Sequence, residues 1–108
     1  DAVMREAAAV VRGHGGDSCA VLTTMEPMVA WYSGCEGWPM PKGNVPSALA
    51  RMRGGGARNN FVVLFAKARR EPTGAVRDDL LAELEQPALA HIPDPTGVLG
   101  DADVYRVR

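Results

Sequence analysis

The sequence predicts an α/β fold: a three-layer, Rossmann-like sandwich with a mostly parallel sheet of four to five strands. Short apolar segments alternate along the chain with segments of helical periodicity. The segment 61–66, FVVLFA, is apolar at every position, as expected for a central strand covered on both faces. Strands that alternate with helices usually pair in parallel through right-handed crossovers, which places helices on both faces of the sheet.

The elements of the first half follow from periodicity and from glycines that end helices. Asp1 can cap a first helix, which the glycines at 13–16 end. SCAVLTT at 18–24 predicts a buried strand, and Pro27 suits the first position of a second helix. The apolar stripe of that helix, expected to face the sheet, consists of Met28, Trp31, Tyr32 and Cys35.

The segment 37–43, GWPMPKG, is expected to be mostly loop with a short edge strand, because its prolines cannot donate to a sheet. Pro46 opens a short third helix, which the glycines at 54–56 end.

The second half predicts a further helix and two more strands. Thr73 can cap a helix that Pro87 closes. Strands are expected at 88–92 and at 102–108, the last of them at an edge of the sheet. No helix separates these two strands, so their pairing can be antiparallel.

Composition indicates one globular domain spanning 1–108. Apolar residues make up 46% of the chain and charged residues 23%, and the formal net charge is −1. A chain without basic excess has little to attract phosphate backbones, so nucleic acid is not an expected partner. No apolar run approaches the roughly 20 residues that span a bilayer. Because the chain begins with Asp1, we expect a piece of a longer protein.

The two cysteines predict a disulfide. From Cys19 the strand advances about 17 Å to its end, and from Pro27 the helix returns about 12 Å to Cys35. The two thiols are therefore expected at the same level, within the Cα separation of about 4.4–6.8 Å that a disulfide requires. A disulfide implies an oxidising, extracytoplasmic compartment.

Two alternatives for the cysteines stay open, reduced thiols and a nucleophile, whereas a metal site does not. Two reduced thiols could simply pack in the core. A metal site would need four ligands, and neither His14 nor His91 has ligand-like spacing to a cysteine, so no metal is predicted. A nucleophilic Cys35 would need a glycine where Ser33 stands.

A candidate ligand crevice follows from the expected sheet. Residues 23–26 lie at the carboxyl end of the first strand and residues 67–70 at that of the central strand, where open α/β sheets bind ligands. Trp38, beside Pro39, is the aromatic residue expected to be exposed. The candidate crevice comprises Thr23, Thr24, Glu26, Trp38, Lys67, Arg69 and Arg70. The alternative is a solvated rim with weak ion pairs.

No catalytic residue and no cofactor is predicted. The glycine runs at 13–16 and 54–56 follow helices and precede strands, so they are expected to cap helices. A phosphate-binding loop has the opposite order, because it follows a strand and opens a helix.

Three segments carry a resemblance to a known group of proteins: SCAVLTTMEPMVAWYSGCEG at 18–37, NNFVVLFAKARRE at 59–71 and DADVYRVR at 101–108. Their order resembles the soluble extracytoplasmic C-terminal domain of actinobacterial polytopic membrane proteins. Those proteins are glycosyltransferase-like and similar to the dolichyl-phosphate-mannose and aminoarabinose transferases.

The resemblance implies a non-catalytic accessory or interaction domain on the extracytoplasmic face of a bacterial membrane. Its implied partners are the transmembrane part of its own parent chain and a glycan or lipid-linked sugar. Two other functions stay open: a cytosolic module that binds a small molecule or nucleotide, and a hydrolase or transferase that depends on Cys35.

Overall fold

The computed structural model describes all residues 1–108 as a mixed α/β structure. Four helices and five strands follow one another along the chain: α1 (Ala2–Gly15), β1 (Cys19–Thr23), α2 (Glu26–Ser33), β2 (Glu36–Pro39), α3 (Val45–Gly54), β3 (Asn59–Phe65), α4 (Gly74–Ala82), β4 (Ala90–Ile92) and β5 (Ala102–Arg106). The predicted α/β class is therefore confirmed, as are the order and approximate bounds of its elements.

All five strands belong to one sheet with the order β2-β1-β3-β5-β4. β1 pairs in parallel with both β2 and β3. β5 pairs antiparallel with β3 on one side and with β4 on the other. The sheet is thus mixed rather than mostly parallel, although the predicted antiparallel pairing of the last two strands is present.

The placement of β5 corrects the expectation of a terminal edge strand. β5 lies between β3 and β4, and the two edges of the sheet are β2 and β4. At this interior position, Ala102, Val104 and Tyr105 are all buried. Two short strands, of four and three residues, take the exposed edges instead.

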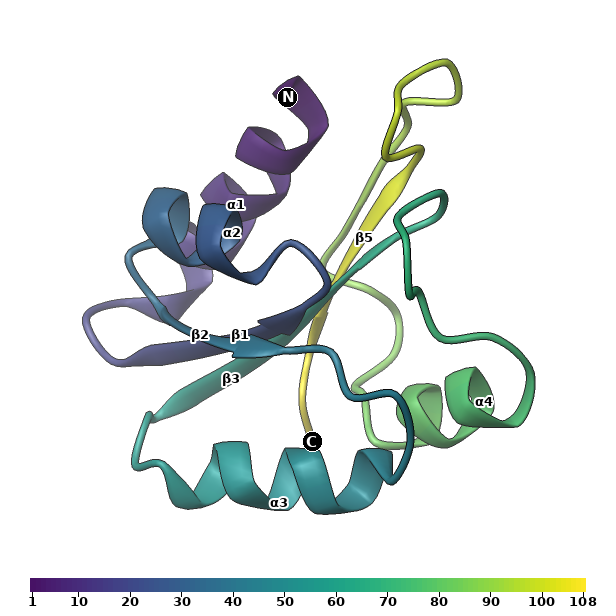
Figure 1. The fold of residues 1–108 in the computed structure, drawn as a ribbon. Helices are drawn as coiled ribbons and strands as arrows, with labels where there is room; N and C mark the ends of the chain where they lie inside the picture. Colours follow the sequence, from purple (N-terminus) through teal and green to yellow (C-terminus); the bar gives the residue numbers. More distant parts are fainter.

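Helices cover both faces of the sheet (Figure 1). α1 and α2 lie on one face, where their buried side chains pack against Val21, Phe61 and Phe65. α3 and α4 lie on the other face and pack against Leu22 and Val62. The apolar residues 61–65 of β3 serve both faces, because successive strand side chains point to opposite sides.

The predicted capping residues are found at the ends of α1 and α3, but α4 differs: the Thr73 side chain makes no capping hydrogen bond, and the helix ends at Ala82, well before Pro87. The Asp1 carboxylate accepts a hydrogen bond from the Val3 amide at 3.0 Å and so caps α1. Glycines of the two predicted runs, Gly16 and Gly55, are the C-caps of α1 and α3. None of the four helices combines the length and the apolar character needed to cross a membrane.

The orientation of α2 differs from the prediction. Val29 and Ser33 are the buried residues of this helix. Met28 is 43% exposed and Trp31 is 82% exposed, so the expected core stripe faces solvent in part. Trp38, predicted to be exposed, lies in β2 and packs against the core beneath α3. The two tryptophans have therefore exchanged their predicted environments.

Candidate functional site

The predicted disulfide joins Cys19 to Cys35, with the two Cα atoms 4.9 Å apart. Cys19 begins β1, and Cys35 follows Gly34, whose left-handed conformation ends α2. Both cysteines are buried, and neither is a free thiol. The bond closes the β1–α2 unit at the amino end of β1 and leaves no thiolate to act as a nucleophile.

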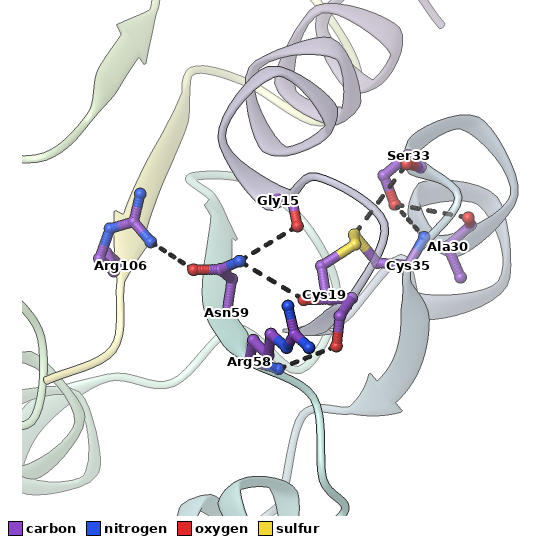
Figure 2. Close-up of a disulfide and its surroundings, with 9 residues drawn as sticks. Gly15, Cys19, Ala30, Ser33, Cys35, Arg58, Asn59 and Arg106 are labelled. Atoms are coloured by element: carbon purple, nitrogen blue, oxygen red, sulfur yellow. Dashed lines mark hydrogen bonds between the residues drawn. A yellow bond between two sulfur atoms is a disulfide. The ribbon is translucent and has the colours of Figure 1, made fainter.

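Figure 2 shows the disulfide with the hydrogen bonds that surround it. A Cβ atom added to Gly15 would lie 2.8 Å from the Cys19 Cβ, so only glycine fits where α1 ends against the bond. The Ser33 hydroxyl accepts a hydrogen bond from the Cys35 amide at 3.2 Å. The Asn59 side chain donates to the Gly15 carbonyl at 3.2 Å and accepts from Arg106. These bonds tie α1, β3 and β5 to this end of the sheet.

The candidate crevice lies at the opposite end of the sheet, at the carboxyl ends of β1 and β3. The chain leaves β1 through α2 on one face and leaves β3 toward α4 on the other face (Figure 1). Diverging connections of this kind create the crevice in which open α/β sheets bind ligands. A cavity of about 120 Å³ occurs here, lined by Thr23, Thr24, Glu26, Pro27, Pro39, Met40, Arg69 and Arg70.

Five of the seven predicted crevice residues line this cavity, and two do not. Trp38 points to the α3 face, where its ring approaches Gly55. Lys67 is held by the loop before β5, because its ammonium group donates to the Pro95 carbonyl and its amide donates to the Leu99 carbonyl. Lys67 does follow the central strand closely, as the sequence predicted, but the local sequence could not reveal that the loop before β5 binds it.

Glu71 is a residue of this region that sequence reasoning missed. The Thr24 hydroxyl donates to its carboxylate at 2.8 Å, and this bond connects the end of β1 to the loop after β3. Glu71 also lines two further cavities of about 280 and 270 Å³, one on each side of the loop. The only sequence signal was a carboxylate in the loop that follows the central strand.

Burial raises the pKa of the Glu71 carboxyl above its ordinary value of 4.5. The hydrogen bonds from Thr24 and the Phe65 backbone, and the charge of Arg77, act in the opposite direction but do not cancel it. The folded state therefore disfavours the charged form of this side chain.

This raised pKa predicts a specific pH dependence of stability. The contribution of Glu71 is fully present below the unfolded-state pKa and is lost as the pH rises through the higher folded-state pKa. Glu71→Gln cannot ionise, so its free energy of unfolding should rise relative to wild type as the pH increases from 4 toward 7. Urea unfolding of both proteins across that range measures the difference. Thr24→Val removes a stabilising hydrogen bond to the Glu71 carboxylate, so in this background the advantage of Glu71→Gln in free energy of unfolding should rise more steeply with pH. An advantage that falls as the pH increases would contradict the raised pKa of Glu71.

A second titratable cluster lies on β4 and β5. His91 Nδ1 lies 2.7 Å from Asp103 Oδ1, and its Nε2 lies 3.5 Å from Asp101 Oδ2. The hydrogen bond to Asp103 and the charge of that residue raise the pKa of His91 above 6.5. His91 and Asp103 face each other in the β4–β5 register, so the pair links the two strands. The histidine is exposed and has the partners of a surface ion pair.

An exposed apolar ridge lies on α2 and is formed by Pro27, Met28 and Trp31. All three side chains are exposed, and their spacing of three and four residues places them on one side of the helix. Pro27 also lines the 120 Å³ cavity, so the ridge begins at the crevice.

No protein-family model, curated protein or solved structure matches this chain. Its function is therefore argued from the disulfide, the crevice and the α2 ridge.

Proposed function

We propose that the chain is a non-catalytic accessory domain on the extracytoplasmic face of a bacterial membrane. In this proposal it belongs to a glycosyltransferase-like membrane protein, contacts that protein's transmembrane part and helps to position a glycan or lipid-linked substrate. We also infer a three-layer, Rossmann-like outline, which the two helix-covered faces of the sheet support.

The observation that carries the proposal is the buried Cys19–Cys35 disulfide. Disulfides persist in oxidising compartments and are rare in the cytosol, where thiols are kept reduced. The chain has no other cysteine, and the bond lies in the core rather than beside a cavity that could serve redox chemistry. A structural role in an exported domain accounts for it.

The α2 ridge supports the glycan contact. An exposed indole offers a flat apolar surface against which the C–H face of a sugar ring can pack, while its N–H remains available to a hydroxyl. Trp31 is 82% exposed, which leaves nearly the whole ring accessible. The disulfide brackets α2, so the helix presents this ring from a fixed position.

A specific observation favours a second candidate function, a cytosolic module that binds a small molecule or nucleotide. The 120 Å³ cavity lies where ligands bind in open α/β sheets, and it contains both arginine and threonine side chains. This candidate gives no account of the disulfide and requires a reducing compartment.

Thiol trapping in the native host separates the two functions. Membrane and cytosolic fractions of cells that express the full-length protein are denatured without reductant and treated with a maleimide polymer, either directly or after reduction. We expect Cys19 and Cys35 to react only after reduction, in the membrane fraction. A Cys35→Ser variant leaves Cys19 free and serves as the labelling control.

Two reactive thiols in a cytosolic protein would overturn the proposal and favour the small-molecule module. A second arm tests the glycan contact with isolated cell-envelope glycan: Trp31→Ala should lose retention, and Val98→Ala, which removes an equally exposed apolar side chain, should retain it. Equal retention of both variants would remove α2 from the proposal.

A further inference from the structure

Arg70 has an unusual backbone conformation, with a φ of 65°. Only one other non-glycine residue has a positive φ, and it is Asn44, a residue type that tolerates this region. A long side chain in the left-handed region costs free energy and persists only where the surrounding structure imposes it. Such residues concentrate at binding sites.

Arg70 lies between two cavities. It lines the 120 Å³ cavity together with Arg69, and it lines the 280 Å³ cavity together with Lys42. The two cavities therefore share one wall, formed by the loop after β3. Lys42 comes from the loop between β2 and α3, so the three cations converge from two separate segments.

These three cations have no anionic partner in the protein. The ion pairs of the chain lie elsewhere, on Arg53, His91 and Arg106. Unpaired arginines beside a cavity are suited to an oxyanion, because the planar guanidinium group binds phosphate or carboxylate through two parallel hydrogen bonds.

The same cavities also contain groups that bind hydroxyls. Glu26 lines the smaller cavity and Glu71 the larger one, and threonine hydroxyls lie in both. Two carboxylates would repel a simple inorganic anion, but they can accept hydrogen bonds from the hydroxyls of a sugar. Cations and carboxylates side by side therefore fit a ligand that carries both an oxyanion and hydroxyl groups.

We infer that the 280 Å³ cavity binds a small anionic sugar, with its phosphate or carboxylate held by Lys42 and Arg70 and its hydroxyls held by Glu71. Neither cavity exceeds about 280 Å³, which suits a single sugar unit rather than a long chain. The site is distinct from Trp31, and the inference holds in either compartment.

Titration of the isotope-labelled 108-residue chain, followed by amide NMR, tests this inference. The probes are glucose 6-phosphate, glucuronate, glucose and inorganic phosphate. We expect at least one of the two anionic sugars to cause saturable shifts at residues 69–73 and at Thr24. Glucose and inorganic phosphate should each bind more weakly than that sugar. The phosphate and carboxylate arms identify the preferred oxyanion.

Arg70→Gly is the decisive variant. Glycine adopts a positive φ without strain, so the melting temperature of the Arg70→Gly protein should equal or exceed that of the wild-type protein. Its affinity for the anionic sugar should fall about tenfold, because one charge-assisted contact is lost. Arg12→Ala removes the same charge from the exposed surface of α1 and should leave the affinity unchanged.

Three results would overturn the inference. One is the absence of saturable shifts with both anionic sugars. Another is an affinity for inorganic phosphate or for glucose that equals the affinity for the anionic sugar. This result would show that the site does not require an oxyanion and hydroxyl groups in one ligand. The third is an equal loss in Arg12→Ala and Arg70→Gly, which would indicate nonspecific attraction. Thiol trapping addresses the compartment separately, so neither experiment decides the other.

Discussion

Reduction of the Cys19–Cys35 disulfide should lower the free energy of unfolding by about 3 kcal/mol, the value expected for closing a loop of this length. The bond spans 16 residues and holds β1, α2 and the start of β2 together. Its loss allows the unfolded chain many more conformations, while the folded core keeps its apolar contacts. Urea unfolding with and without a reductant measures the difference.

The Cys19→Ser, Cys35→Ser double variant provides the control. It should match the reduced wild-type protein within the cost of burying two hydroxyls, and a reductant should not change it. A wild-type protein equally stable under both conditions would show that the cross-link does not constrain the unfolded state.

Phe61→Ala should destabilise the protein by about 3–5 kcal/mol, as expected when a buried aromatic ring is removed. Phe61 is fully buried in β3, and its ring lies close to Gly15 at the end of α1. The Arg106 guanidinium group covers the ring, 5.1 Å from its centroid. The variant would leave a cavity that the rigid β3–β5 pairing cannot close. Thermal and urea unfolding measure the loss.

Trp31→Ala is the matched comparison for this prediction. It removes a larger aromatic side chain, but one that is 82% exposed, so its stability should stay within about 0.5 kcal/mol of wild type. Phe61→Leu retains most of the buried volume and should lose much less than Phe61→Ala. Equal losses for Phe61→Ala and Trp31→Ala would contradict the assignment of the core.

The sequence was sufficient for properties that depend on local pattern. The apolar run 61–65 of β3, the prolines at the starts of α2 and α3, and the glycines at the ends of α1 and α3 each act within a few residues. The disulfide was also predictable, because a strand followed by a returning helix determines the level at which Cys35 meets Cys19.

Properties that depend on distant partners were not predictable from the sequence. The helix α2 carries apolar residues on several sides, so periodicity could not decide whether Val29 or Trp31 faces the sheet. Glu71 gained its role only because the loop after β3 folds back to Thr24. Strand order is likewise absent from local pattern: β5, with the sequence ADVYR, mixes apolar and charged residues, and such a composition does not distinguish an interior from an edge position.

The position of β5 has a consequence for biosynthesis. Among the five strands it emerges last from the ribosome, yet both of its neighbours, β3 and β4, are made earlier and pair with it. Until residues 102–106 are available, the apolar β3 presents an open flank to any other extended chain. A nascent molecule would therefore benefit from a chaperone that shields this flank until residues 102–106 have emerged and paired with β3.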